Sequence, residues 1–410
     1  MDLNHQKTSV VVGIRNSLDS VATVVLLQRQ GYKVSAVHVQ THNSELTHKL
    51  KLAQLHCQEG PIDGLRKICD GLSVPLYLVD MKQVFAEEIV DTALNSELMK
   101  LDFHPCFHCA KLKLIVLYQK MLKLEHDYFA LGYYAKIRNP ISKNINDEEK
   151  IQISAAKDLM YDQAPLVAQA PLELMSKLLL PLGDMMKDDV YNIVKNSVSN
   201  SLFESITNNS KTSSTNSQKK CVFFEDRVHA VTKTFLPNYL PKLRPFWRDT
   251  KTHLNESLDL VQCHAGEEIK IQGVFTNQKD QVLIIGKLDY SKREIEIGSK
   301  ESLSFDICQL KIIQKLGDIE SFRPISVLCR FSLESELHPA ILSFRGLGFA
   351  TLQFEKLMPF HALRSWITIY ENNEKTLKCI YSARILTEWK KSDQGNPFFT
   401  PFDKLKEYPI

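Results

Sequence analysis

The chain has 410 residues, of which 44% are hydrophobic and 24% charged, and its formal net charge is +3. This length predicts two or three domains, and the composition is typical of globular proteins, which excludes the disordered and fibrous classes. The charge is too weak to argue for nucleic-acid binding by itself.

The N-terminal residues lack the basic-then-apolar order of a signal peptide, and no apolar run reaches the roughly 18 residues that a membrane helix needs. We therefore expect a cytoplasmic protein that does not enter a membrane. The nine cysteines are an odd number. In an intracellular chain they indicate thiols, metal ligands or sulfur chemistry rather than a disulfide framework.

The first third of the chain alternates short β-branched runs with stretches of helical spacing. This alternation predicts a parallel sheet with helices on both faces. Ligands of such sheets bind at the carboxyl ends of the strands, where the strand order reverses, so the turn after Val12 is a candidate for that place. The expected strands are Val10–Ile14, Lys33–Gln40, Val74–Asp80 and Asp127–Gly132, and the expected helical stretches are Leu18–Gln30, Ile62–Leu72, Val84–Met99 and Ala110–Leu124.

The chain changes character beyond this region. From Ala168 to Asn196 the pattern predicts mainly helix, with Asp184 as a helix cap. The polar, low-complexity stretch Thr207–Lys220 predicts a mobile surface loop. Short strands separated by turns follow, and they predict two small β domains divided near Ile319–Arg323.

The turn between the first strand and the first helix reads "RNSLDS" over residues 15–20. Glycine-rich turns at this place bind phosphate, because bare backbone N–H groups and the helix N-terminus point at the anion. This turn has no glycine after Gly13. By itself it is therefore either a phosphate site or a plain connection in which Ser17 or Asp19 caps the helix.

The segment "HPCFHC", residues 104–109, offers two cysteines and two histidines within six residues. Such a C-x-x-C pair can hold a metal, form a redox disulfide or pack as inert side chains. The chain has no second C-x-x-C pair, so a complete structural zinc site is not expected.

A further cysteine, Cys221, follows two lysines directly after the polar loop. Neighbouring cations favour the thiolate, which is the nucleophilic form of cysteine. The alternative is a strand residue with a small apolar side chain.

Together, these segments resemble the tRNA-uridine 2-sulfurtransferases (tRNA 2-thiouridylases), a family of PP-loop ATPases. The opening strand, turn and helix resemble the family's S-G-G-x-D-S region, and "HPCFHC" with its helix resembles its N-P-[D/C]-x-x-C-N segment. "YDQAPLV" and "PLGDMMKDDV" are similar to its K-D-Q-S-Y-F-L and PLG-x-x-x-K-x-x-V stretches, and "SQKKCVFF" to its S-Q-D-I-C-F-I segment. The closing strands are similar to its final β-barrel.

The resemblance implies a reaction. ATP, with Mg²⁺, adenylates O2 of the wobble uridine of a tRNA, and a cysteine persulfide then supplies sulfur to the activated carbon. By motif position Cys109 corresponds to the nucleophilic cysteine and Cys221 to the persulfide-bearing one. Some members hold a 4Fe-4S cluster through three cysteines, and Cys106 completes that set here. The implied partners are tRNA and a sulfur-donor protein, and a monomer is expected.

The resemblance also implies binding residues and domain boundaries. The residues expected at ATP are Gly13, Ile14, Arg15, Asn16, Ser17, Leu18, Asp19, Ser20, Val39 and Gly132. The residues expected at tRNA are His104, Pro105, Cys106, Tyr133, Tyr161, Asp162, Gln163, Arg330 and Phe331. The expected α/β fold has a PP-loop domain at 1–235, a small central β domain at 236–320 and a C-terminal β-barrel at 321–410.

The chain departs from the family pattern in the loop. Asn16 and Ser17 replace its two glycines, and Arg15 offers a guanidinium in place of backbone amides. Two functions follow. The chain is a divergent sulfurtransferase, favoured by the cysteines, or a catalytically reduced paralogue that binds tRNA or a partner, favoured by the loop. An iron–sulfur protein of unrelated activity is a third hypothesis.

Overall fold

The computed structural model of the protein describes most of the N-terminal half, separate strands of the middle region and most of the C-terminal part. The described residues are 8–41, 62–92, 95, 105–138, 151–211, 242–247, 252–253, 258–259, 268–270, 282–289, 292–317, 323–332, 336–359, 365–372 and 376–389. No helix in these ranges is both long and apolar enough to cross a membrane.

The N-terminal part is a five-stranded parallel sheet in the order β3-β2-β1-β4-β7. Its strands are β1 (Ser9–Gly13), β2 (Lys33–Gln40), β3 (Leu76–Asp80), β4 (Tyr128–Ala130) and β7 (Leu178–Leu179). The parallel α/β architecture predicted from the sequence is confirmed. Strand β7 lies inside the stretch expected to be mainly helix, which corrects that expectation.

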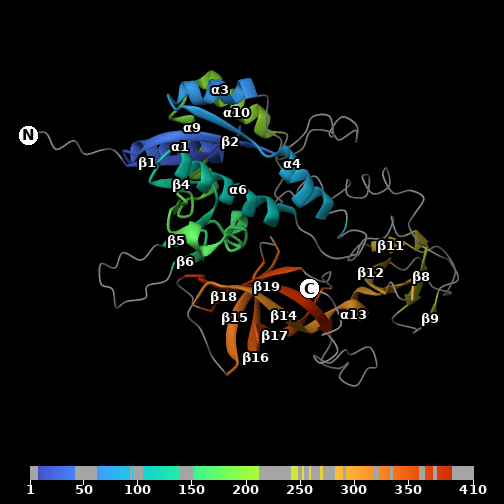
Figure 1. The fold of residues 1–410 in the computed structure, drawn as a ribbon. Coiled ribbons are helices and arrows are strands. Elements are labelled where there is room, and N and C mark those ends of the chain that lie inside the picture. Colours follow the sequence, from blue (N-terminus) through green and yellow to red (C-terminus); the bar gives the residue numbers. More distant parts are fainter. Residues whose placement is uncertain are drawn as a thin grey trace, which may run out of the picture.

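Helices cover both faces of this sheet (Figure 1). The longer ones are α1 (Leu18–Arg29), α3 (Ile62–Gly71), α6 (Pro105–Lys123), α9 (Lys187–Lys195) and α10 (Asn200–Lys211). The shorter ones are α4 (Lys82–Phe85), η1 (Ala86–Asp91), η2 (Leu159–Tyr161), α7 (Ala164–Val167) and α8 (Leu172–Met175), and a hairpin pairs β5 (Ala135–Arg138) with β6 (Gln152–Ala155).

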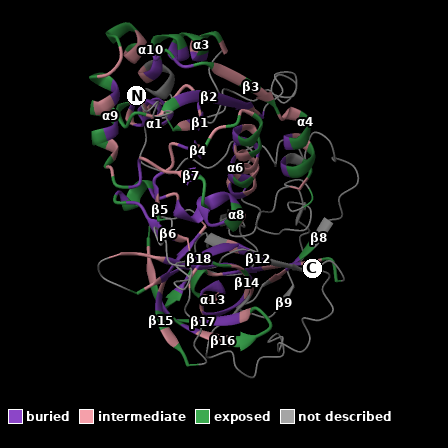
Figure 2. Ribbon diagram, turned by 60° about the vertical axis from the view of Figure 1, so that its left-hand side comes forward, coloured by how far each residue is buried: buried purple, intermediate pink, exposed green. Residues whose placement is uncertain are grey.

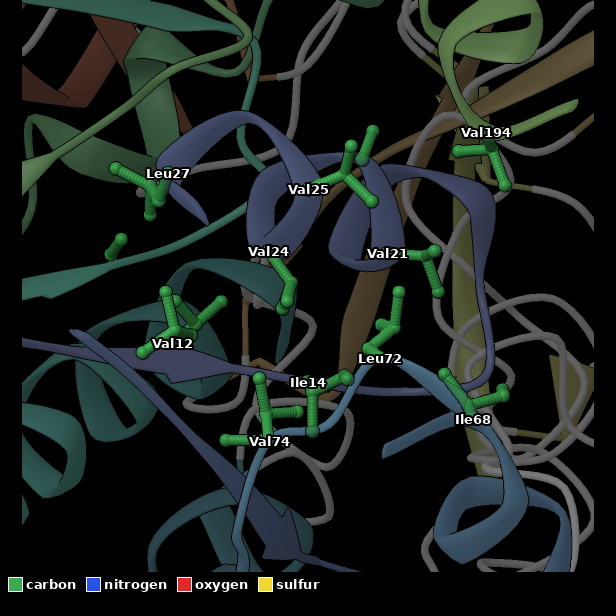
Figure 3. Close-up of a cluster of buried hydrophobic side chains, with 14 of the residues drawn as sticks. Val12, Ile14, Val21, Val24, Val25, Leu27, Ile68, Leu72, Val74 and Val194 are labelled. Atoms are coloured by element: carbon green, nitrogen blue, oxygen red, sulfur yellow. The ribbon is translucent and has the colours of Figure 1, made fainter. Parts of the chain in front are cut away.

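Alternation along β1 sends neighbouring valines to opposite faces, as the period of a strand requires. Val10 and Val12 pack into the cluster formed with α1, α3 and α9, where Figure 3 shows Val12 below Val21 and Val24. Val11 packs into the other cluster, beside Leu117 of α6. Both faces of the central strands β1 and β2 are therefore buried, whereas the edge strand β3 is intermediate or exposed (Figure 2).

Two local expectations for this part are corrected. Helix α9 begins at Lys187 after Met186, and Asp184 forms an ion pair with Lys136 (2.8 Å) instead of capping a helix. Helix α10 runs to Lys211, so the first residues of the stretch expected to be a loop are helical. Residues 212–220 lie outside the described residues.

The C-terminal part is a closed antiparallel barrel in the order β14-β17-β16-β15-β18-β19. Its strands are β14 (Phe305–Lys315), β15 (Ile325–Phe331), β16 (His338–Gly346), β17 (Phe349–Met358), β18 (Trp366–Glu371) and β19 (Cys379–Trp389). The barrel is confirmed, but β14 pairs with β17 and β19. The barrel therefore begins before the boundary at residue 321 that the sequence predicted.

A second sheet precedes the barrel and lies to its side in Figure 1. It consists of β8 (Lys242–Trp247), β9 (Thr252–His253), β10 (Leu258–Asp259), β11 (Glu268–Lys270), β12 (Val282–Asp289) and β13 (Glu294–Gly298), with α13 (Lys300–Leu303) leading into the barrel. A β-rich middle region was expected from the sequence.

The barrel packs directly against the underside of the N-terminal part. Backbone pairing joins them, with the N–H of Ala155 donating to the carbonyl of Leu377 at 2.9 Å. Gln169 donates to the hydroxyl of Ser382 at 2.8 Å. Asp162 and Arg330 form an ion pair in which neither side chain is exposed.

Gly183 allows a close approach that any side chain would prevent. A Cβ atom on Gly183 would lie 2.1 Å from the carbonyl oxygen of Ala135. We expect Gly183→Ala to lower the free energy of unfolding by about 1–3 kcal/mol or more, because backbone must move. Denaturant titration measures this loss.

Gly64→Ala is the matched control. A Cβ on Gly64 would lie 3.5 Å from Nδ2 of Asn16, which is an ordinary van der Waals contact. Gly64 also lies within α3, and alanine is favoured over glycine in a helix by about 1 kcal/mol. Equal destabilisation by the two substitutions would contradict the packing argument.

Candidate active site

The strand order reverses between β1 and β4. The chain passes from β1 outward to β2 and β3, and then returns to β4 on the other side of β1. The turn after β1 and the segment after β4 therefore flank the switch point at the carboxyl ends of the strands. The position predicted for the turn after Val12 is confirmed.

The turn at this point is closed by its own serines. The N–H of Arg15 donates to Oγ of Ser20 at 3.2 Å, and Oγ of Ser20 donates back to the Arg15 carbonyl at 2.5 Å. Ser17 is the N-cap of α1, and its side chain accepts from the N–H of Ser20. The capping role predicted for Ser17 or Asp19 thus falls to Ser17, and some donors that a phosphate would use are already bound.

Asp19 is the centre of a cluster of polar and aromatic side chains. Its Oδ1 accepts from the hydroxyl of Tyr134 at 2.8 Å and from Nζ of Lys187 at 2.5 Å. The same ammonium lies 5.2 Å and 5.3 Å from the ring centroids of Tyr134 and Tyr161. Burial, followed by the negative charge of Asp19, raises the pKa of Tyr134, which keeps this phenol protonated.

Lys187 is itself fixed in place. Its backbone N–H, at the start of α9, donates to Oδ2 of Asp158 at 3.1 Å. The Lys187–Asp19 ion pair is partly buried, so solvent screens it less than a surface pair. A positive charge is therefore held beside the turn.

The two cysteines of the "HPCFHC" segment lie in the first turns of α6. This helix begins at Pro105, before the Ala110 start expected from the sequence. Cys106 and Cys109 are three residues apart, which places them on neighbouring positions of one helix face. Both are half-buried.

Tyr133 connects these cysteines with the turn after β1. Burial raises the pKa of Tyr133 to about 12, and the other charges that act on its phenol are those of Lys113, Cys109, Arg15 and Cys106. Cys106 and Tyr133 also pack against one small apolar cluster, which consists of Phe107, Ala110, Leu166 and Trp366. Cys106 and Tyr133 therefore pack together near the switch point, and the charges of Arg15 and Cys109 act on the Tyr133 phenol.

Some residues expected at ATP have a packing role. Ile14 and Val39 are almost fully buried, and their side chains lie in the two core clusters. A Cβ on Gly13 would lie 2.7 Å from Leu117, and one on Gly132 would lie 2.8 Å from the carbonyl oxygen of Asp19. Both glycines permit close packing around the turn.

Four residues expected at tRNA are buried, which corrects that expectation. Phe331 lies in the barrel core, and Arg330 is held by Asp162. These two, with Asp162, have no exposed surface, and Pro105 is also buried. Side chains without accessible surface cannot contact RNA in this structure.

The remaining tRNA expectations fall on more accessible positions. Tyr161 is 39% exposed, and Gln163 is half-buried, with its Oε1 accepting from the N–H of Tyr134 at 3.0 Å. His104 lies outside the described residues, and so does Cys221. Within the described ranges no three His, Cys, Asp or Glu side chains are placed to hold a metal ion. Cys106 and Cys109 by themselves supply two of the three ligands expected for a cluster.

Sequence reasoning did not single out Lys187, Tyr134 or Trp366. Lys187 had a signal, since it stands at the lysine of the PLG-x-x-x-K stretch. Tyr134 had only its place beside Tyr133. No sequence signal pointed to Trp366, because a tryptophan at the start of a barrel strand is typical of the hydrophobic core.

Curated relatives and solved structures resemble parts of this chain. The tRNA-specific 2-thiouridylase MnmA of Natranaerobius thermophilus is 27% identical over 189 residues, covering 45% of this chain and 50% of the relative. That of Treponema denticola is 31% identical over 188 residues, covering 45% and 49%. The matches thus span about half the length of these relatives. An NMN synthetase structure from Francisella tularensis is 12% identical and covers 49% of this chain and 67% of its own, at a TM-score of 0.28.

A family model matches a longer part of the chain than these pairwise alignments do. The matched residues are 8–216, which is half of the chain and contains the parallel sheet, its helices and the switch point. The chain therefore belongs to the family described as the tRNA methyl transferase HUP domain.

Proposed function

We propose that this protein thiolates a uridine of tRNA, with Cys109 as the nucleophile. The observation that supports the proposal is the packing of Cys106 with Tyr133 on one apolar cluster near the switch point of the sheet, where the charges of Cys109 and Arg15 also act on the Tyr133 phenol. Parallel α/β sheets bind their ligands at that place. The relatives named tRNA-specific 2-thiouridylase favour this reaction over others that use a thiol.

The chemistry divides into activation and sulfur transfer. O2 of the uridine attacks the α-phosphorus of ATP and expels pyrophosphate. The Cys109 thiolate then attacks the inner sulfur of a persulfide on Cys221. This forms a Cys109–Cys221 disulfide and releases hydrosulfide, which adds to C2 of the base as AMP leaves. A thiol reductant restores both cysteines, and a separate sulfur-donor protein reloads the persulfide.

The described residues have distinct tasks in this scheme. Arg15 is exposed beside the turn and offers a guanidinium to phosphate oxygens. Cys109 is the fifth residue of α6 and is assigned the nucleophilic role. Burial raises the pKa of Tyr133 to about 12, so its phenol stays protonated at neutral pH and can donate a hydrogen bond to a bound substrate.

A second candidate function rests on the closed turn. The side chains of Ser17 and Ser20 accept hydrogen bonds from backbone N–H groups of the turn, and Lys187 donates to the carboxylate of Asp19. In this second function the protein binds tRNA or a partner and does not itself catalyse the reaction with ATP, because the hydrogen-bond donors of the turn are already bound within the turn. The first two tests below separate the two functions.

ATP with Mg²⁺ is expected to bind with weaker than micromolar affinity, because Asn16 and Ser17 replace glycines and the turn satisfies its own donors. The double substitution Asn16→Gly/Ser17→Gly is expected to tighten binding, since it frees backbone for the phosphates and costs the cap only a few tenths of a kcal/mol. Isothermal titration calorimetry measures both affinities. Asn372→Gly, an exposed barrel position, is the control.

Submicromolar binding by the unaltered protein would show that other groups, such as Arg15, replace the lost contacts. No tightening in the double variant would mean that the turn is not the phosphate site.

Cys109→Ser and Cys221→Ser are each expected to abolish 2-thiouridine while leaving tRNA binding intact, since both thiols take part in sulfur transfer. Cys106→Ser removes activity only if a cluster forms. Mass spectrometry of tRNA nucleosides, in cells without another thiouridylase, measures the product. Cys69→Ala is the control, because Cys69 is a buried thiol of α3. Unchanged 2-thiouridine when the gene is deleted would favour the binding-protein function.

Tyr161 is expected to stack on an RNA base, because its ring is exposed and lies beside the Lys187 ammonium. Tyr161→Ala should weaken tRNA binding by about 1–3 kcal/mol, the value of one stacked base. Filter binding at several salt concentrations measures this loss. Tyr32→Ala is the control, since Tyr32 directly precedes β2 and so lies at the amino-terminal end of the parallel strands, away from the switch point. Equal effects of both substitutions would remove Tyr161 from the RNA surface.

A further inference from the structure

The cysteine-bearing turn of α6 is held by the barrel through an aromatic contact. Phe107 lies between Cys106 and Cys109 in the sequence and is 1% exposed. Its ring stacks on Trp366 of β18, with centroids 5.5 Å apart and an interplanar angle of 28°. Offset stacking at this distance is a favourable geometry for aromatic rings.

Trp366 is itself fixed from within the barrel. Its partner across the β18–β19 ladder is Arg384, whose guanidinium carbon lies 3.9 Å from the centroid of the Trp366 ring. A guanidinium over an indole is a strong cation–π arrangement. Arg384, Trp366 and Phe107 therefore form one stack that runs from the barrel wall to the first turn of α6.

The contact is local to the candidate site. Phe107 and Trp366 form a small apolar cluster with Ala110 and Leu166, and Cys106 and Tyr133 pack against it. The other contacts between barrel and sheet described above involve Ala155, Asp162 and Gln169 rather than α6.

The indole N–H of Trp366 sets it apart from an ordinary core tryptophan. Trp366 is 8% exposed, yet its Nε1 has no hydrogen-bond partner among the described residues. Buried tryptophans usually find such a partner. The ring contacts with Phe107 and Arg384 are thus the interactions that fix this side chain.

We propose that Trp366 is a positioning residue for the cysteine pair, acting through Phe107 to hold the first turn of α6 in place. The proposal rests on the proposed function in that Cys109 is taken as the nucleophile. It adds that the barrel completes the site, although no barrel residue needs to touch the reacting atoms.

The test measures the reactivity of the two thiols in the full-length protein. The rates of iodoacetamide modification of Cys106 and Cys109 are followed across pH by peptide fragmentation mass spectrometry. Trp366→Ala is expected to accelerate modification on the order of tenfold, which corresponds to about 1.4 kcal/mol of local opening. Trp366→Phe, which keeps a ring and lacks the N–H, is expected to behave as the unaltered protein.

Phe354→Leu is the matched control. Phe354 is a buried aromatic of the barrel core that packs on Phe305 and Phe331. The Phe354→Leu substitution should lower the melting temperature without changing the alkylation rates of Cys106 and Cys109. The proposal is overturned if folded Trp366→Ala shows unchanged rates, or if Phe354→Leu accelerates them equally.

A second pair of variants serves if Trp366→Ala does not fold. Phe107→Leu and Trp366→Leu, alone and combined, form a double-mutant cycle on the same alkylation rates. Non-additive effects support the stack, and additive effects overturn it. Thiol rates that respond to Trp366 in a protein without thiolation activity would support the positioning role and reject the proposed function. If Cys109→Ser abolishes thiolation but substitutions of Trp366 leave the alkylation rates unchanged, the proposed function is supported and the positioning role is rejected.

Discussion

Asp162 and Arg330 form an ion pair in which neither side chain has exposed surface, and this pair joins the sheet-bearing part to the barrel. Asp162 also accepts from the N–H groups of Ala156 and Ala164 and from the hydroxyl of Tyr370. A buried carboxylate with one partner missing is costly, so these contacts form together or the interface does not form. The barrel is thereby set in one position beneath the sheet, and the contact of Trp366 with α6 depends on that position.

The switch point between β1 and β4 combines features of an enzyme and of a binding protein. The helix that carries Cys106 and Cys109 starts beside it, and Arg15 adds a positive charge. The turn itself is satisfied by its own serines, and Asp19 is neutralised by Lys187. Thiol chemistry needs the cysteines and the positive charge of Arg15. Tight phosphate binding needs hydrogen-bond donors, and in this turn the serines have already bound some of them.

Much of the fold followed from local patterns in the sequence. The valines of β1 and the helical spacing after Leu18 predicted the parallel sheet, because strand and helix periods differ and are visible within one segment. The sequence also predicted that Ser17 or Asp19 caps the first helix, because serine and aspartate are favoured at the N-cap, and the cap is Ser17.

Long-range pairing decided the rest. The resemblance to the family placed Arg330 and Phe331 at tRNA, but Arg330 is buried against Asp162 and Phe331 lies in the barrel core. Strand alternation marks two faces of a barrel strand but does not show which face is covered. The Asp19–Lys187 pair joins residues 168 positions apart, and no local pattern connects them. The membership of β14 in the barrel depends on closure with distant strands. The sequence by itself determined the elements and the chemistry they carry, and only the tertiary structure decided which of those side chains face one another, because contacts across the chain are set by packing rather than by local periodicity.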